Sequence, residues 1–399
     1  MTSRTPGDSA ARAGAGLKRE MTRNNSGSLV LITGGAGFIG SHTAEALLES
    51  GYRVRLLDSL NPQIHPGAKT PEHLPRGAEL QRGSVCDRSD VAKAMEDASY
   101  VLHFAAETGV GQSMHELERY FHTNVTGTAV VWQEIQRRGA QVQKVVLSSS
   151  RAVYGEGLYE CVSCGLVTPP ARDEGRLAQR KWTQSCPECG RDITSLPTPE
   201  TATPSCTSVY ALTKLMQEQI STLIAAQTGV RLAILRYFNV YGPRQALTNP
   251  YTGIVAGFAT RILNGKDIPL YEEGTPTRDF VHVDDVVQAN LRALELDTDE
   301  TLIANVGTGR ANSIRDIAES LRRALDSDVP ITSTTRYRRG DIFSCTADLS
   351  KASAQLGYEP TVSLDAGLRA LAPWLREQNP MDRSEAVEAE LRTVGVLRG

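Results

Sequence analysis

The sequence predicts an α/β fold built on a doubly wound parallel sheet, and three observations support this prediction. Short apolar segments alternate with stretches of helical length through roughly the first 240 residues of the 399-residue chain. A glycine-rich turn directly follows the first apolar segment, and a Tyr and a Lys with helical spacing occur further along. Strands separated by helices run parallel, and such sheets bind ligands at the carboxyl ends of their strands.

The composition excludes several classes of function. The net charge of −3 gives no field that would recruit nucleic acid or an anionic membrane. No apolar run approaches the ~20 residues that span a bilayer, and residues 1–27 lack the apolar core of a signal peptide. We therefore expect a cytoplasmic protein without nucleic-acid or membrane partners, and a disordered extension at residues 1–27.

The first predicted strand, 28–32, leads into the turn Thr33-Gly34-Gly35-Ala36-Gly37-Phe38-Ile39-Gly40 and a helix to about residue 50. These glycines permit a tight turn, close approach of the backbone to a pyrophosphate, and close packing of helix on strand. The next strand, 53–57, is followed by Asp58, whose carboxylate would bind an adenosine ribose and repel a 2′-phosphate. The segment predicts a site for NAD rather than NADP.

Further strands are predicted at 79–81, 100–104, 142–148 and 232–238, with the last completing the sheet. A helix is predicted over 116–138, and it carries Asn124 in an otherwise apolar stripe. Because a buried Asn more often satisfies backbone groups than does chemistry, we expect that role for Asn124. The strand at 142–148 delivers Ser148, Ser149 and Ser150 to the ligand edge of the sheet.

A candidate catalytic pair lies at Tyr210 and Lys214. Residues four apart lie on one helical face, so the ammonium can sit beside the phenol and favour its phenolate. The hydroxyl of Ser150 could share the proton of a substrate. Together these residues indicate a tyrosine base.

Four cysteines separate Ser150 from Tyr210 along the chain, in two Cys-x-x-Cys-Gly motifs with Cys161, Cys164, Cys186 and Cys189. Four thiolates fill the tetrahedral coordination of zinc and leave no open position, so we expect a structural zinc site. Two disulfides or free thiols are the alternatives, which a reducing cytosol and the spacing disfavour.

The segment 156–204 that holds these cysteines has too few apolar residues to fold alone, so zinc would supply its folding free energy. We expect a zinc-ribbon-like module beside the cleft. It could contribute a wall or a lid, with Arg151, Tyr159 or Trp182 as contributors.

The remainder of the chain continues the alternation. Helices are predicted at 253–265, 284–295 and 313–325, and strands at 268–271 and 301–306. We expect a substrate-binding domain, mainly 241–375, after an NAD-binding domain at 28–240 that is interrupted by 156–204. The segment 376–399 is polar, could form an exposed helix, and suggests no function.

Five motifs occur in order along the chain: the glycine turn at 33–40, His103-Phe104-Ala105-Ala106, Ser148-Ser149-Ser150, Tyr210-x-x-x-Lys214, and Arg236-Tyr237-Phe238-Asn239-Val240-Tyr241-Gly242-Pro243-Arg244. Together they resemble the extended short-chain dehydrogenase/reductase family, in its subgroup of nucleotide-sugar epimerases and dehydratases. The resemblance covers about residues 28–375 with one insertion. It implies a Rossmann domain, an NAD cofactor, a nucleotide-sugar substrate and a homodimer.

The resemblance also implies a role for each matching residue. Tyr210 is the catalytic base, Lys214 binds the nicotinamide ribose and lowers the pKa of the tyrosine, and Ser150 contacts the sugar. The implied cofactor-binding residues are Gly34, Gly37, Phe38, Ile39, Gly40, Asp58 at the ribose, Asp87 at the adenine, Ala105, Tyr210 and Lys214. The implied substrate-binding residues are Asn239, Arg278 and Arg338, since a guanidinium offers a bidentate fork to phosphate.

The residues after Ser150 discriminate among the reactions of this family. Dehydratases usually carry an Asp-Glu pair there, and decarboxylating relatives keep a Glu at the second position. Arg151 and Ala152 occupy these positions, which favours epimerisation through a 4-keto sugar. Further segments, including the cysteine insertion, are similar to bacterial dTDP-L-rhamnose 4-epimerases.

We therefore expect an NAD-dependent 4-epimerase of a dTDP-6-deoxyhexose such as dTDP-L-rhamnose. The alternatives are a UDP-hexose or UDP-hexuronate 4-epimerase and, less favoured, an NDP-sugar dehydratase or reductase. A non-catalytic NAD-binding regulator is the rival from a different class. The retention of Ser150, Tyr210 and Lys214 argues against it.

Overall fold

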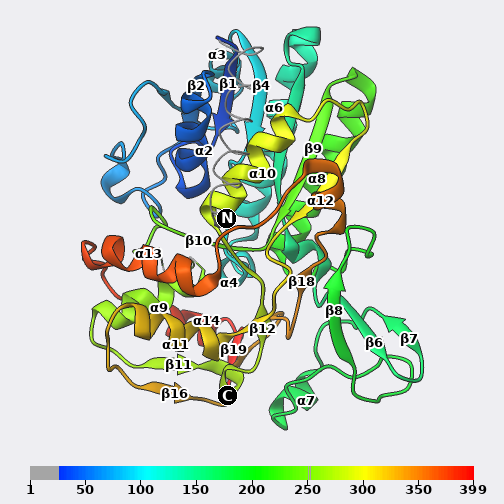
Figure 1. Cartoon of the computed structure of the whole chain (residues 1–399), viewed down its shortest axis with the longest axis vertical. Coiled ribbons are helices and arrows are strands. Elements are labelled where there is room, and N and C mark those ends of the chain that lie inside the picture. The colour runs from blue at the N-terminus through cyan, green and yellow to red at the C-terminus, as the bar shows by residue number, and fades with distance from the viewer. Residues whose placement is uncertain (1–26, 250, 252) are drawn as a thin grey trace, which may run out of the picture.

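The computed structural model describes residues 27–249, 251 and 253–399, so residues 1–26 of the expected extension lie outside the described residues. Figure 1 shows three parts. A large sheet with its helices fills the upper half, a second group of helices and short strands lies at the lower left, and a small sheet lies at the lower right. No helix of the described residues is long and apolar enough to cross a bilayer.

The large sheet has seven parallel strands in the order β14-β9-β5-β4-β1-β2-β3. Its strands are β1 (Leu29–Thr33), β2 (Arg53–Asp58), β3 (Glu79–Arg82), β4 (Ala98–His103), β5 (Lys144–Ser150), β9 (Arg231–Tyr237) and β14 (Leu302–Val306). The predicted parallel sheet is confirmed.

Helices cover both faces of this sheet. One face carries α2 (Phe38–Glu49), α10 (Val283–Glu295) and α12 (Ser350–Leu356), and the other carries α3 (Arg88–Ala94), α6 (Gly127–Arg138) and α8 (Val209–Thr228). Each face has its own apolar core, with Leu47 and Val286 in the first and Trp132 and Ala225 in the second. The fold is therefore doubly wound, as the sequence predicts.

The expectation that 232–238 completes the sheet and that 301–306 lies in a smaller domain is wrong. Strand β14 pairs in parallel with β9, from Leu302 opposite Ala233 to Val306 opposite Tyr237. Helix α10, also expected in the smaller domain, packs on α2. Without β14, the outer backbone groups of the buried strand β9 would have no partners, and this is the physical reason for the seventh strand.

The helix predicted over 116–138 forms in three pieces: α5 (Leu117–Tyr120), a π-helical turn (Phe121–Thr126) and α6. Asn124 lies in the π-helical turn and is buried. Its side chain accepts the N–H of Glu107 at 2.7 Å and donates to the Glu107 carbonyl at 3.1 Å and to Thr213 Oγ1 at 2.9 Å. The expectation that Asn124 satisfies backbone groups is confirmed.

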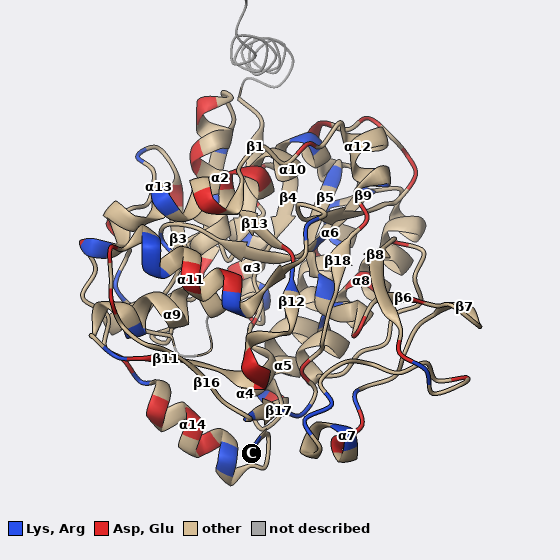
Figure 2. Ribbon diagram, turned by 60° about the horizontal axis from the view of Figure 1, so that its bottom comes forward, with Lys and Arg blue, Asp and Glu red and all other residues tan. Residues whose placement is uncertain are grey.

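The second group of elements has a separate core with Phe258, Leu321 and Leu371. Its helices are α9 (Ile254–Leu263), α11 (Ile314–Ala324) and α13 (Leu364–Arg376), and its strands include β11 (Ile268–Leu270) and β16 (Ile331–Ser333). Helix α14 (Ser384–Thr393), banded with acidic residues in Figure 2, lies along its edge. The final strand β19 (Leu397–Arg398) pairs with β17 (Tyr337–Arg338).

The segment 156–204 forms the small sheet at the lower right of Figure 1. It contains β6 (Leu158–Cys161), β7 (Gly165–Val167), α7 (Glu174–Ala178) and β8 (Thr194–Thr198). Strand β6 pairs antiparallel with β7 and β8, and β8 pairs in parallel with β18 (Thr346–Ala347) from the distant C-terminal part of the chain. The cysteine-bearing segment is therefore joined to the C-terminal half as well as to its neighbours in sequence.

Candidate active site

A cleft of about 500 Å³ opens at the carboxyl ends of the parallel strands. Its wall is formed by the glycine turn after β1, the ends of β2, β4 and β5, the start of α8 and the segment after β9. Of the candidate residues, Gly34, Gly37, Phe38, Ile39, Gly40, Asp58, Ala105, Ser150, Tyr210, Lys214 and Asn239 line it. Parallel α/β sheets bind ligands at this edge.

The glycine turn fits a pyrophosphate. Gly34 has a φ of +68°, and a Cβ there would lie 2.8 Å from the backbone nitrogen of Ala105. A Cβ at Gly40 would lie 2.5 Å from the carbonyl oxygen of Gly34. At Gly37, by contrast, a Cβ would meet only the Gly34 oxygen, at 3.3 Å, on a wall of the cleft. Gly37 also precedes α2, so the positive end of a helix dipole faces the ligand.

Asp58 ends β2 at the same cleft. Its carboxylate accepts the backbone N–H groups of Ala36 at 3.0 Å and Leu60 at 2.9 Å, which fixes its orientation. A fixed carboxylate in this place suits the hydroxyls of an adenosine ribose.

The structure does not bring Asp87 to the cleft. This residue is the N-cap of α3, where its carboxylate accepts the N–H groups of Ser89 and Asp90. The hydrogen bond from the Ser89 hydroxyl holds the pKa of Asp87 below its usual value. Its neighbours Ser84 and Val85 line the cleft instead. An Asp just before a helix is a common capping signal, so the sequence contained this information.

Ser150, Tyr210 and Lys214 converge although the cysteine segment separates them in sequence. Ser150 is the last residue of β5, and the other two lie on the first turns of α8. The N-cap Ser208 accepts the N–H of Ala211 at 3.1 Å and thereby fixes the start of this helix. Lys214 Nζ donates to the carbonyl oxygen of Ser148 at 2.7 Å and to Gln217 Oε1 at 2.9 Å.

The pKa of Tyr210 responds to burial, to Ser150 and to Arg151. Burial raises the pKa of Tyr210, and the hydrogen bond with Ser150 and the positive charge of Arg151 act in the opposite direction. Burial lowers the pKa of Lys214 itself to about 7. The effect of Lys214 on the pKa of Tyr210 stays a prediction. Arg151, next to Ser150 in the sequence, is therefore a site residue whose electrostatic role sequence reasoning missed.

The three implied substrate residues lie in different places. Asn239 lines the cleft, and its buried Oδ1 has no hydrogen-bond partner among the described residues. Arg278 and Arg338 do not line the cleft. Arg278 donates to the carbonyl oxygens of Phe343 and Ile342, at 3.1 and 2.8 Å, and Arg338 stacks on the ring of Tyr271 at 5.0 Å.

Carboxylates are scarce in the cleft. Among the described residues that line it, Asp58 and Glu107 are the acidic ones, and Glu107 forms an ion pair with Arg119 at 2.7 Å. Arg151 and Ala152 also line the cleft, beside Ser150. The site thus contains a hydroxyl, a phenol and two basic side chains, without an acidic pair next to the serine.

The four thiols of Cys161, Cys164, Cys186 and Cys189 lie within 4.8 Å of one another, and none is in a disulfide. The Sγ atoms of Cys161 and Cys189 are 3.6 Å apart. A tetrahedral zinc ion with bonds of about 2.3 Å would place its sulfurs about 3.8 Å apart. The geometry therefore fits one tetrahedral metal ion.

None of the described residues in 156–204 lines the cleft. Tyr159 instead donates a hydrogen bond to Glu156 at 3.0 Å, and Trp182 packs on Tyr337 with ring centroids 6.4 Å apart. The expectation that the module forms a wall of the cleft is therefore wrong for Tyr159 and Trp182, because their side chains are used in packing. Of the three proposed contributors, only Arg151 reaches the cleft.

The profile of the NAD dependent epimerase/dehydratase family matches residues 30–167 and 182–307. The gap between the two matched segments falls inside the cysteine-bearing segment. A dTDP-L-rhamnose 4-epimerase of Burkholderia thailandensis is 38% identical over 355 residues, which cover 88% of this chain and 96% of the relative.

Solved structures show the same likeness. A UDP-glucose 4-epimerase of Thermotoga maritima, solved with UDP-glucose, is 32% identical with a TM-score of 0.72, covering 88% of this chain and 99% of that one. A UDP-glucuronic acid 4-epimerase of Bacillus cereus, solved with UDP-glucuronic acid and NAD, is 27% identical with a TM-score of 0.71 and the same coverages.

Proposed function

The chain belongs to the NAD dependent epimerase/dehydratase family, and from this membership we propose that it is an NAD-dependent nucleotide-sugar 4-epimerase. One observation carries the proposal: Ser150, Tyr210 and Lys214 line the same cleft as the glycine turn. The lack of an acidic pair beside Ser150 favours epimerisation over dehydration, because removal of water needs a group to donate a proton and another to accept one.

The glycine turn and the N-terminus of α2 would hold the pyrophosphate of NAD, and Asp58 its adenosine ribose. NAD supplies a hydride acceptor that returns the hydride in the same turnover. Lys214 would bind the nicotinamide ribose. Its attachment to Ser148 keeps it at the end of β5, beside Ser150.

Tyr210 acts as the base. Its phenolate takes the proton of the sugar 4-hydroxyl while the hydrogen on that carbon leaves as hydride, which gives a 4-keto sugar. Ser150 donates a hydrogen bond to the same sugar oxygen, and Arg151 stabilises the negative charge of the phenolate. When the hydride returns to the opposite face, Tyr210 gives the proton back and the carbon is inverted.

We propose that Asn239, Arg278 and Arg338 bind the diphosphate of the substrate. The buried Oδ1 of Asn239 has no hydrogen-bond partner among the described residues, so it could accept a hydrogen bond from a ligand in the cleft. Arg278 uses its Nη atoms for backbone carbonyls, so it would contribute its charge and its Nε–H.

A dTDP-6-deoxyhexose such as dTDP-L-rhamnose is the substrate we propose first, because the relative with 38% identity bears that name. A UDP-hexose or UDP-hexuronate is the second candidate, favoured by structural neighbours solved with such sugars. Purified protein incubated separately with dTDP-L-rhamnose, UDP-glucose and UDP-glucuronate, and monitored by NMR, distinguishes them. Inversion of a UDP-sugar alone would rule out the first candidate, and inversion of none would contradict the proposed activity.

We also propose that Cys161, Cys164, Cys186 and Cys189 bind one structural zinc ion. The close approach of their four sulfurs supports this proposal. With four protein ligands the ion would have no open position for a substrate, so it would act on the fold rather than in the reaction. Metal analysis of the purified protein tests the stoichiometry.

A homodimer is proposed as the assembly. Leu212 and Leu223 on α8 and Leu117 on α5 are large apolar side chains with exposed fractions of 41, 61 and 47%. Apolar side chains on neighbouring helices suit burial against a second copy. Light scattering coupled to size-exclusion chromatography would report the mass.

A further inference from the structure

The hairpin formed by β6 and β7 carries two of the cysteines at its tip and two buried charged residues near its base. Cys161 and Cys164 lie at the turn, whereas Glu156 precedes β6 and Arg172 follows β7. The side chain of Glu156 is 1% exposed and that of Arg172 is 3% exposed. Charged groups are rarely buried so completely unless they are paired, so their partners indicate what they do.

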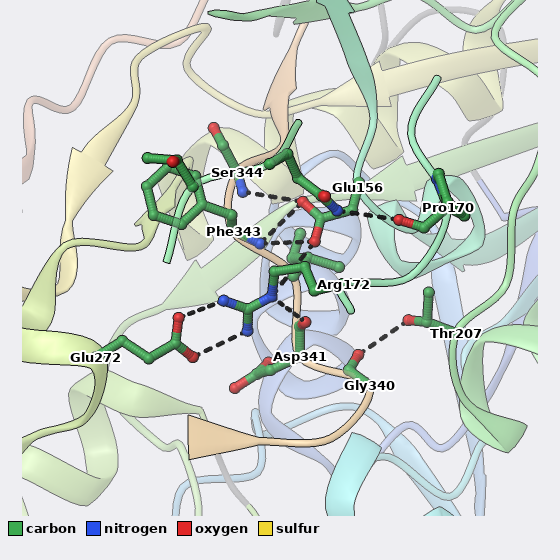
Figure 3. Close-up of polar contacts among 12 residues, drawn as sticks. Glu156, Pro170, Arg172, Thr207, Glu272, Gly340, Asp341, Phe343 and Ser344 are labelled. Carbon is green, nitrogen blue, oxygen red and sulfur yellow. Dashed lines mark hydrogen bonds and ion pairs between the residues drawn. The ribbon is translucent and has the colours of Figure 1, made fainter. Parts of the chain in front are cut away.

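Glu156 holds the backbone of the segment 340–344. Its two carboxylate oxygens accept the N–H of Phe343, at 3.0 and 2.9 Å, as Figure 3 shows. One of them also accepts the hydroxyl of Tyr159 at 3.0 Å. The Nε of Arg172 lies 3.6 Å from the other. These contacts fix both the carboxylate and the backbone segment that it faces.

Arg172 reaches the same segment from another direction (Figure 3). Its Nε donates to the carbonyl oxygen of Asp341 at 3.0 Å. Its two terminal nitrogens form a bidentate pair with the buried carboxylate of Glu272, one of them at 2.9 Å. Burial raises the pKa of Glu156 and of Glu272, and the charge of Arg172 opposes that rise in both.

The segment 340–344 also contacts Arg278, one of the proposed substrate residues. Arg278 donates to the carbonyl oxygens of Ile342 and Phe343, and its Nη2 lies 3.4 Å from Asp341. The N–H of Phe343 therefore bonds the cysteine module while its carbonyl bonds Arg278. One peptide segment thus joins the module to a proposed diphosphate-binding residue.

The same segment also touches the catalytic helix. The hydroxyl of Thr207 donates to the carbonyl oxygen of Gly340 at 3.0 Å, as drawn in Figure 3. Thr207 directly precedes Ser208, the N-cap of the helix that carries Tyr210. A displacement of 340–344 would therefore reach both Arg278 and the start of α8.

We propose that Glu156 and Arg172 are positioning residues through which the cysteine module holds the segment 340–344, and with it Arg278, in place for a nucleoside diphosphate. The module lines no part of the cleft, but it contacts the segment 340–344, to which Arg278 is hydrogen-bonded. This inference rests on the proposed function for the nature of the ligand. The contacts that carry it are independent of the reaction.

The test uses two conservative variants and one matched control in the full-length protein. Glu156→Gln keeps an acceptor for Phe343 but loses the charge, and Arg172→Lys keeps the charge but loses the bidentate fork. The control is Glu174→Gln, which removes an exposed ion pair between Glu174 on the module and Arg339 next to the same segment. Zinc and NAD contents of each variant report whether the fold is retained.

Two measurements read the positioning directly. Hydrogen exchange of the 338–346 peptide should become faster in Glu156→Gln and Arg172→Lys and stay unchanged in Glu174→Gln. Calorimetry gives the dissociation constants of dTDP and UDP. For whichever of the two binds the wild type more tightly, the dissociation constant should rise about tenfold in Glu156→Gln and in Arg172→Lys. With an active substrate, KM should rise by the same factor while kcat changes less than about threefold.

Faster exchange at 338–346 with unchanged diphosphate affinity would overturn the proposal, as would unchanged exchange. If one substitution prevents folding, the other still decides, because each removes a different contact to the segment. A failure of the proposed epimerase activity is distinguishable, since the wild type would then bind a nucleoside diphosphate without inverting any sugar.

Discussion

The Nζ of Lys214 donates a 2.7 Å hydrogen bond to the carbonyl oxygen of Ser148. This contact attaches the first turns of α8 to the end of β5, two residues before Ser150. The serine and the tyrosine of the site are thus held together by the sheet and its helix. The chain between them is free to form a separate module.

Replacing Tyr210 by Phe should reduce kcat by about 10³-fold, because the base that takes the sugar proton is lost. Bound NAD should stay at the wild-type amount, since the glycine turn and Asp58 are unchanged. Turnover assays and NAD content after denaturation provide the two measurements. Tyr100→Phe, which alters an exposed hydrogen bond to Gln143, is the control and should be active. Wild-type turnover in Tyr210→Phe would exclude this base.

Replacing Arg151 by Gln should move the acidic limb of the kcat/KM profile to higher pH by about one unit. The charge of Arg151 lowers the pKa of Tyr210, so its removal raises that pKa and a higher pH is needed to form the phenolate. Arg151→Lys keeps the charge, so its acidic limb should lie close to the wild-type pH. An unchanged limb in Arg151→Gln, with altered KM only, would assign Arg151 to substrate binding.

Asp58→Asn should weaken NAD binding and strengthen NADP binding, each by about tenfold. The amide keeps the size of the side chain but loses the charge that repels a 2′-phosphate. Calorimetric titration of cofactor-free protein with both dinucleotides measures the ratio. Asp87→Asn, at the cap of α3 outside the cleft, should leave this ratio unchanged. Equal losses for both cofactors in Asp58→Asn would indicate a structural role alone.

Purified protein should contain one zinc ion per chain, and Cys164→Ser should lose it, because three thiolates and a hydroxyl bind zinc far more weakly. Mass spectrometry of the metal content and thermal unfolding provide the readouts. Cys86→Ser, whose thiol bonds the His122 carbonyl far from the cluster, should retain the metal. Zinc-free wild-type protein with the same melting temperature would contradict the structural site.

Arg236→Met should lower the free energy of unfolding by about 3–5 kcal/mol. Arg236 and Glu218 form a buried bidentate pair at 2.9 and 2.7 Å between β9 and α8, and the substitution leaves the carboxylate buried without its cation. Denaturant titration measures the change. In contrast, Arg231→Met removes a partner of the exposed Asp297 and should cost less than about 1 kcal/mol. Equal losses would show that burial does not determine the cost.

Local chemistry explains which residues could be predicted. The glycine turn could be predicted because its positive φ angle and close backbone approaches require glycine at particular positions. Asp58 could be predicted because it directly follows an apolar strand. Tyr210 and Lys214 lie one helical turn apart, so their convergence requires only that α8 forms. The spacing of the four cysteines likewise indicated the cluster that the fold brings within 4.8 Å.

Placement of distant segments could not be predicted. Strand β14 joins the large sheet because β9 needs a hydrogen-bonding neighbour. The local sequence does not predict which strand will be that neighbour. The motif around Arg278 predicts a phosphate ligand. In the fold, however, its Nη atoms donate hydrogen bonds to carbonyl oxygens that lie 64 and 65 residues away in the sequence.

The sheet class, the glycine turn, the Tyr210–Lys214 pair and the cysteine cluster each depend on residues close together in the chain, so the sequence alone predicts them. The packed fold, by contrast, shows that the charge of Arg151 acts on Tyr210, and that the cysteine module contacts the segment 340–344 rather than lining the cleft. Both outcomes depend on burial and on charges that approach across the fold, and these quantities exist only once the chain has packed.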